Sequence, residues 1–132
     1  MLNLEPLAAQ YAQSMVVDDA KKAENLITKS AAVLAEQGVY AFGLFLASRK
    51  NDELKQAGNI DRAIRNLLEQ ARLVDKEVKN VKDQYGNFYA TIGKKRDKET
   101  EVDALRRLLL TKQLMEVALN YGRYHAKAQG GS

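Results

Sequence analysis

The sequence predicts an all-α protein, a single helical bundle of four to six helices with one long antiparallel helix pair. The composition is rich in strong helix formers, and its single proline, Pro6, leaves long stretches unbroken. Apolar residues also recur at steps of three and four, the spacing of an amphipathic helix. A chain of 132 residues is long enough for one domain with its own core. We therefore expect one helical domain over residues 1–128 and a flexible tail over residues 129–132.

The first third of the chain is expected to form two helices. Pro6 suits the first turn of a helix, where its missing N–H costs nothing. The apolar spacing is interrupted around residues 16–20, where Asp18 or Asp19 can cap a second helix. Gly38 stands at the position of a C-terminal stop for that helix.

A run of eleven uncharged residues, 38–48, follows in a chain that is 29% charged. The run is shorter than the roughly 18 apolar residues that a membrane-spanning helix needs. We therefore predict a buried helix, with Phe42 and Phe45 in the core and Gly43 allowing another helix to approach closely.

The most regular pattern in the sequence is a heptad seam with alternating steps of four and three. Its members are Ile60, Ile64, Leu67, Ala71, Val74, Val78, Val81 and Tyr85. Gly58 and Asn59 indicate a helix start, and Gly86 indicates a stop. The pattern predicts one long helix that forms the antiparallel pair with the C-terminal helix. A seam of this kind also suits pairing between two chains, although we favour packing within the chain.

The last part of the sequence predicts an exposed loop and a final helix. Residues 86–98 contain two glycines and four basic residues, a composition typical of a loop. Thr100 and Asp103 resemble a capping box, and the helix is expected from about residue 99 to residue 127. Seven apolar residues should face inward: Val102, Leu105, Leu108, Leu109, Met115, Ala118 and Leu119.

The sequence carries little that suggests catalysis. It has no cysteine, and its single histidine, His125, is not accompanied by a nucleophile motif. The Glu-x-x-His pair of helical di-iron sites would need a glutamate at position 122, which is Gly122. Phosphate-cradling loops are also absent. We therefore expect no enzyme activity, no metal and no cofactor.

The absence of cysteine and of a secretion-signal pattern in the first residues predicts a cytoplasmic protein. We also expect no membrane partner, since no apolar run is long enough to span one, and no small-molecule substrate. The net charge of +4 is unevenly distributed, since residues 1–48 sum to −2 and residues 49–132 to +6. Such asymmetry favours a polyanionic partner for the second part of the chain.

Three clusters combine basic and aromatic residues, the side chains that bind phosphates and stack on unpaired bases. They are Phe42 and Phe45 before Arg49 and Lys50; Phe88 and Tyr89 before Lys94, Lys95 and Arg96; and Tyr121, Arg123, Tyr124 and Lys127. The first pair of phenylalanines lies in the apolar run and fits the core better than a binding surface.

The order of these features resembles the small subunit of the Cmr (type III-B) CRISPR effector complex, the fifth Cmr protein. Residues 34–46 fit the family's pattern of a hydrophobic residue, a glycine and a closing Phe-Leu. Residues 110–124 fit its Leu-Thr-Lys pattern followed by aromatic and basic residues. The chain lacks the tryptophan that family members often carry near the C-terminus, and residues 76–97 match nothing in the pattern.

The resemblance implies a non-catalytic structural subunit in antiviral defence, present in several copies along the guide and target RNA. Its partners would be other effector subunits, copies of itself, and the guide–target duplex or the target single strand. Seven basic residues are expected to contact RNA: Arg49, Lys50, Arg106, Arg107, Lys112, Arg123 and Lys127. Lys94, Lys95 and Arg96 are further candidates in the loop. The alternatives are the small subunit of the Csm (type III-A) complex and a coiled-coil homo-oligomeric scaffold without nucleic acid.

Overall fold

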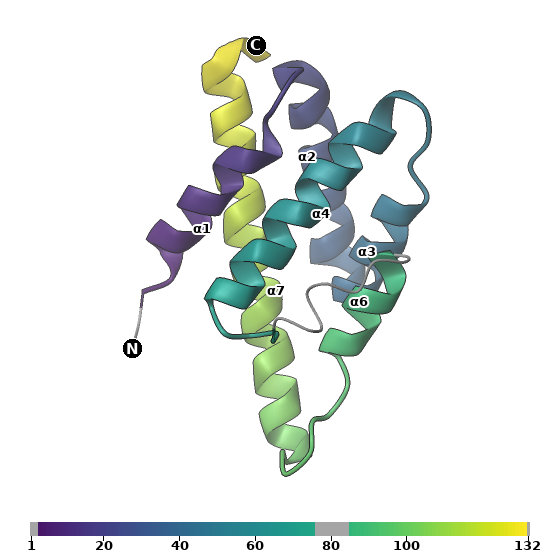
Figure 1. The fold of residues 1–132 in the computed structure, drawn as a ribbon, viewed down its shortest axis with the longest axis vertical. Coiled ribbons are helices and arrows are strands. Elements are labelled where there is room, and N and C mark those ends of the chain that lie inside the picture. Colours follow the sequence, from purple (N-terminus) through teal and green to yellow (C-terminus); the bar gives the residue numbers. More distant parts are fainter. Residues whose placement is uncertain (1–2, 76–84, 132) are drawn as a thin grey trace.

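The computed structural model describes residues 3–75 and 85–131, and within them the chain is all-helical (Figure 1). The predicted fold class, a helical bundle, is confirmed. The helices are α1 (Glu5–Ala12), the short 3₁₀ helix η1 (Gln13–Met15), α2 (Ala20–Gln37), α3 (Val39–Ala47), α4 (Asp52–Gln70), α6 (Tyr85–Ile92), α7 (Glu101–Ala126) and a final π-type turn, η2 (Lys127–Gly131).

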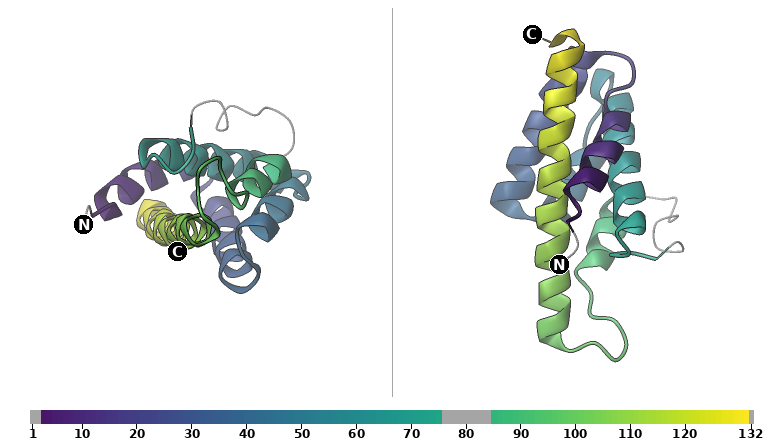
Figure 2. Two further views of the ribbon diagram at one scale, coloured as in Figure 1. Left: turned by 90° about the horizontal axis from the view of Figure 1, so that it is seen from below. Right: turned by 90° about the vertical axis from the view of Figure 1, so that its left-hand side faces the viewer.

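The long antiparallel pair consists of α2 and α7. Lys112 of α7 donates to the carbonyl oxygen of Ala35, and Gly122 of α7 lies against Ile27. Residue numbers thus rise along one helix as they fall along the other, and Figures 1 and 2 show the two helices side by side. The pair was expected between α7 and the heptad helix, but α4 packs mainly on α1, η1 and α2 and touches α7 little.

The heptad seam is interrupted where a continuous helix was predicted. Helix α4 starts earlier than predicted, at Asp52, and ends at Gln70, and Arg72 then adopts a left-handed backbone conformation with φ of 61°. Val74 lies in the turn that follows and is buried, so its side chain still belongs to the core although the helix does not continue. Val78 and Val81 lie outside the described residues, as does the side chain of Tyr85.

The first three seam residues, Ile60, Ile64 and Leu67, are fully buried within this chain. The described part of the seam therefore packs internally and is not a free surface for a second copy.

The predicted helix boundaries around α2 and α7 are confirmed by their caps. Asp19 accepts a hydrogen bond from the backbone N–H of Lys22 at 3.1 Å. Gly38 ends α2 with φ of 96°, a conformation that favours glycine. Thr100 and Asp103 form the expected capping box, each side chain accepting from the other residue's backbone N–H.

Helix α3 forms within the uncharged run as predicted, but only one side of it is buried: Phe42 and Leu46 are fully inaccessible, whereas Tyr40 and Leu44 are exposed. Helix α6 packs on it so closely that a Cβ at Gly43 would lie 2.6 Å from Cδ2 of Tyr89. Phe88 and Tyr89 are buried, so the prediction of an exposed loop over residues 86–92 is wrong. The aromatic residues fold as a helix because α3 offers them an apolar surface.

The N-terminal end of α7 extends beyond the other helices. Figure 1 shows this end, together with the loop that follows α6, at the bottom of the molecule. Helix α2 has 18 residues against 26 in α7, so it is shorter by about 12 Å at 1.5 Å per residue. At the other end, η2 packs against α2. In the described part of the chain, no helix is both long and apolar enough to cross a membrane.

Candidate nucleic-acid interface

The outer face of α7 is open to solvent along the length of the helix. Figure 2 (right) shows α7 in front of the bundle with nothing covering it. Arg106 and Tyr124 are 18 residues apart, or five turns, and so lie on the same side of the helix. Arg123 and Lys127, one turn apart, are exposed beside Tyr124, whose side chain is 65% accessible. We call these four residues the α7 face.

The three cations of the α7 face are unpaired. The side chains of Arg106, Arg123 and Lys127 form no ion pair or hydrogen bond with any residue that the structure describes. From Arg106 to Lys127 the helix rises about 31 Å, several times the spacing of phosphates along a nucleic acid strand. The face therefore offers free positive charge and one exposed aromatic ring over an extended line.

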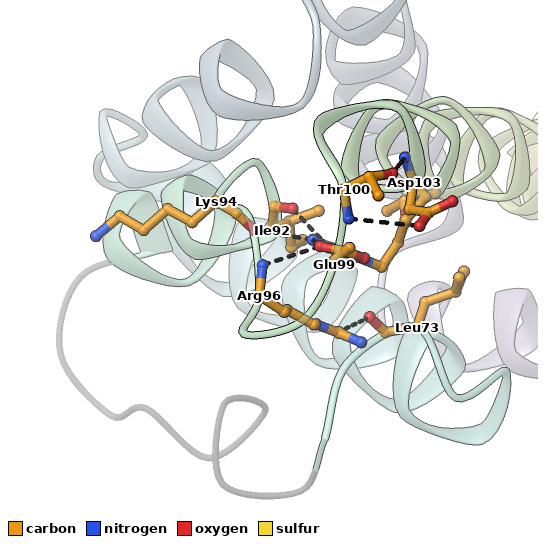
Figure 3. Close-up of polar contacts among 9 residues, drawn as sticks. Leu73, Ile92, Lys94, Arg96, Glu99, Thr100 and Asp103 are labelled. Atoms are coloured by element: carbon orange, nitrogen blue, oxygen red, sulfur yellow. Dashed lines mark hydrogen bonds and ion pairs between the residues drawn. The ribbon is translucent and has the colours of Figure 1, made fainter.

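The loop between α6 and α7 continues this positive charge beyond the helix. We call residues 93–99 the basic loop. Lys94, Lys95 and Lys98 are exposed and have no ion-pair partner among the described residues. Figure 3 shows the side chain of Lys94 extending away from the cluster of polar contacts beneath it. The guanidinium of Arg96 instead donates to the carbonyl oxygen of Leu73, in the turn that follows α4 (Figure 3).

Arg107 lies next to Arg106 in the sequence but points into the protein. Its Nε and Nη2 donate to the two carboxylate oxygens of Glu99, each at 3.1 Å. Its Nη1 donates to the carbonyl oxygen of Ile92 at 2.7 Å, and Nη2 donates to that of Lys94 at 2.8 Å. Only 9% of its side chain is accessible. Arg107 is therefore occupied by the chain itself, and we call this set of contacts the Arg107 clamp.

Glu99 is the centre of the clamp. Besides binding Arg107, its Oε1 accepts the backbone N–H of Arg96 at 2.9 Å (Figure 3). The hydrogen bonds from Arg107, and then that from the Arg96 backbone, lower the pKa of the Glu99 carboxyl from its ordinary 4.5 to about 2. Glu99 therefore stays ionised and paired at neutral pH.

Arg49 and Lys50 lie on the connection between α3 and α4, which Figure 1 places at the right-hand edge, away from α7. Arg49 lies over the ring of Phe45, with Cζ 4.0 Å from the ring centroid, and pairs with Glu53 at 3.3 Å. Lys50 is exposed and has no partner among the described residues. The structure does not bring these two candidates together with the α7 face.

Lys112 has an internal contact too. Its ammonium group donates to the carbonyl oxygen of Ala35 at 3.3 Å, in the last turn of α2. A cation at that position satisfies a terminal carbonyl group and interacts favourably with the helix dipole.

The aromatic residues of the predicted clusters have different environments. Phe88 and Tyr89 are buried, so the prediction that they stack on bases is wrong. Phe42 is in the core, as expected. Tyr121 donates from its hydroxyl to Glu5 on α1, and this hydrogen bond raises the Tyr121 pKa. Tyr124 is the member of the three clusters that remains fully available to a ligand.

The sequence interpretation missed a buried polar network between α4 and α6. Asp61 pairs with Arg65 at 2.9 Å and accepts a hydrogen bond from the Tyr89 hydroxyl at 2.9 Å. Burial raises the pKa of Asp61, and the nearby Arg65 opposes that shift. The Asp-x-x-x-Arg spacing of an i,i+4 pair was the available signal, but nothing in the sequence indicates that the pair is buried.

The part of the chain that the structure describes contains no group of three or more His, Cys, Asp or Glu side chains placed to hold a metal ion. His125 lies half-buried in the last turn of α7. Comparison with protein-family models, with curated proteins and with solved structures finds no match for this chain.

Proposed function

We propose that this protein is the RNA-facing structural small subunit of a type III-B CRISPR effector complex, acting in the cytoplasm without catalytic activity. The observation that supports the proposal best is the α7 face. The side chains of Arg106, Arg123 and Lys127 are unpaired among the described residues and lie on the exposed side of α7 and its C-terminal extension, with Tyr124 beside two of them. Cations aligned over such a length suit the backbone of an extended RNA strand.

The division of the basic residues into paired and unpaired ones supports the same proposal. Arg49, Arg107 and Lys112 make contacts within the chain, whereas the cations of the α7 face and of the basic loop remain available. These available cations lie on α7, on its C-terminal extension and in the loop that leads into it, whereas Lys50 is exposed away from them. The small subunit of the type III-A complex, which has the same character, is the closest alternative to this assignment.

Purification of the tagged protein from its native host tests the assembly directly. We expect the purification to recover a multi-subunit complex that carries short RNAs with a shared end derived from a CRISPR repeat. The identity of the co-purifying subunits would distinguish type III-B from type III-A. Recovery of the protein alone would contradict the proposal.

RNA binding by the isolated protein tests the α7 face. We expect weak, sequence-tolerant binding of a single-stranded RNA, with an affinity that falls as salt rises. The triple variant Arg106→Ala, Arg123→Ala, Lys127→Ala should reduce the slope of log K against log salt by about 0.7 per lost phosphate contact.

The matched control for that variant removes three lysines that already have partners. Lys22, Lys29 and Lys55 pair with Asp52, Glu53 and Asp18 respectively. Their replacement by alanine changes the net charge equally but should leave the salt slope nearly as in the parent. If both triple variants lower the slope to the same extent, binding follows net charge and the α7 face is not the site.

A protein-only scaffold is the second candidate, favoured by one observation. Val102, Leu105, Leu109 and Leu110 are each 44–57% exposed on the N-terminal half of α7. Since the described heptad seam is internal, these residues are the better surface for a scaffold. Concentration-dependent sedimentation without any affinity for RNA would favour this candidate.

A further inference from the structure

The conformation of the basic loop is fixed by Arg107 of α7. The Arg107 clamp bonds the carbonyl oxygens of Ile92 and Lys94 and the carboxylate of Glu99. It thus joins both ends of the loop to α7. A planar guanidinium is suited to this task, because its donors form a rigid fork that binds a carboxylate through two parallel hydrogen bonds.

Further contacts fix the interior of the loop. The backbone N–H of Arg96 donates to Glu99 Oε1, and the backbone N–H of Glu99 donates to the carbonyl oxygen of Arg96 at 3.1 Å. The Arg96 side chain fastens the loop to the end of α4 through the Leu73 carbonyl oxygen. Lys98 adopts a left-handed conformation with φ of 66°, which the surrounding contacts hold in place.

Three lysine side chains of the basic loop take no part in the clamp. Lys94, Lys95 and Lys98 lie within five residues, all exposed, and none has an ion-pair partner among the described residues. The loop leads directly into α7, so these lysines lie beyond the end of the helix that carries Arg106, with the exposed Glu101 and Asp103 of its first turn between them. A loop already ordered before binding loses little conformational entropy when it binds a ligand.

We propose that the basic loop is a preorganised phosphate-binding element for single-stranded RNA, and that Arg107 and Glu99 are its positioning residues. Lys94, Lys95 and Lys98 contact the RNA backbone, while Arg107 contacts no phosphate. This inference rests on the proposed RNA-binding function and reassigns Arg107, a predicted contact, to a supporting role.

Glu99→Gln gives the sharpest test. Its effect on net charge predicts tighter RNA binding, whereas its effect on the Arg107 clamp predicts weaker binding. The substitution raises the net charge by one, so simple electrostatics predicts tighter RNA binding. The amide would place an NH₂ group against the Arg107 donors and break the two-point pairing. We therefore expect weaker binding and a salt slope lower by up to about 2, or about 0.7 for each of three lost contacts.

Glu101→Gln is the matched control. Glu101 is exposed in the first turn of α7 and takes no part in the clamp. Its replacement makes the same change in charge and should leave RNA binding equal to the parent or slightly tighter.

Arg107→Lys provides a second variant that leaves the net charge unchanged. A lysine cannot reproduce the fork that holds Glu99 and the two carbonyl oxygens, so it should lower the salt slope as Glu99→Gln does. Arg72→Lys is its control, since Arg72 is exposed in the turn after α4 and its side chain forms no hydrogen bond or ion pair with the described residues. Thermal melting should show that all four variants remain folded.

The outcomes separate the two proposals. A weaker slope for Glu99→Gln and Arg107→Lys, equal to that of the triple variant Lys94→Ala, Lys95→Ala, Lys98→Ala, supports the inference. A parent that binds RNA while Glu99→Gln binds as well as Glu101→Gln overturns the inference and leaves the α7 face as the site. A parent without any salt-dependent RNA binding contradicts the proposed function itself, and the inference with it.

Discussion

The two halves of α7 have similar numbers of apolar residues but different environments. The C-terminal half, residues 111–126, buries seven positions against α1 and α2: Thr111, Leu114, Met115, Ala118, Leu119, Gly122 and Ala126. The N-terminal half, residues 101–110, contains no fully buried residue and exposes Val102, Leu105, Leu109 and Leu110. One continuous helix is therefore a core element at one end and a surface at the other.

The difference lies in the small residues and in the length of the neighbouring helix. Ala118, Gly122 and Ala126 recur at four-residue steps in the C-terminal half, so other helices can approach closely on that side. At Gly122 the approach is close enough that a Cβ would lie 2.8 Å from the sulfur of Met15. The N-terminal half has no glycine, and α2 ends near Lys112, before it could cover that half. Counts of leucine alone do not reveal which half is buried.

The largest expected effect is the difference in the free energy of unfolding between a leucine truncation in the C-terminal half and one in the N-terminal half. Leu119 is fully buried, so Leu119→Ala should reduce the free energy of unfolding by about 2–5 kcal/mol through lost burial and the cavity left behind. Leu105 is 56% exposed, and Leu105→Ala should stay within about 0.5 kcal/mol of the parent. Denaturant unfolding of both variants measures the contrast. Equal losses would mean that the N-terminal half is covered in solution, by a second copy or by a rearranged loop.

A smaller effect is expected at the close glycine contacts. Gly43→Ala would push against Cβ, Cγ and Cδ2 of Tyr89, atoms near the backbone that cannot move aside. We expect a loss of about 1–3 kcal/mol from overpacking. Gly122→Ala meets the flexible end of Met15, and alanine favours a helix by about 1 kcal/mol over glycine. It should therefore stay close to the parent.

Thermal unfolding of the two glycine variants should rank Gly43→Ala well below Gly122→Ala. The reverse order would show that α7 is packed more rigidly against η1 and α2 than α6 is against α3.

The two halves of α7 also differ in how much of their structure could be predicted from the sequence. The fold class, the Asp19 and Thr100 caps and the Gly38 stop follow from local chemistry, and the structure confirms them. The inward side predicted for α7 is correct for Met115 and Leu119 but wrong for Val102, Leu105 and Leu109. Periodicity gives the face of a helix that is apolar, but not whether another element is long enough to cover it.

The candidate site was harder to predict for the same reason. Arg106 and Arg107 are identical in type and adjacent in sequence, yet one is exposed and the other is bound to Glu99. The turn at Arg72, which follows the end of α4 inside an unbroken heptad pattern, is likewise not visible in the periodicity; its backbone N–H groups bond back to Leu68 and Glu69. Composition identifies the residues that could bind RNA, whereas only the packed structure separates free cations from occupied ones.

The smallest expected effect is confined to the protruding end and depends on pH. The pKa of Glu99, about 2 in the folded protein, is below the ordinary 4.5 that it regains on unfolding. A carboxyl with a depressed pKa stabilises the folded state above its unfolded pKa, and that contribution is lost as the pH falls through the folded pKa. The stabilisation that Glu99 contributes should therefore be complete at neutral pH, begin to fall below pH 4.5 and be lost near pH 2, where the carboxyl of the folded protein is itself protonated.

Titration of the Glu99 carboxyl by NMR measures this directly, with the Arg96 amide resonance reporting the hydrogen bond that it donates. In Arg107→Ala the largest cause of the shift is removed, so the Glu99 pKa should move back towards 4.5. The amides of residues 114–126 should not follow the Glu99 titration, because this part of α7 is packed against α1 and α2. A Glu99 pKa near 4.5 in the parent would show that Arg107 does not hold the loop, and the separation between a clamped end and a packed end would fail.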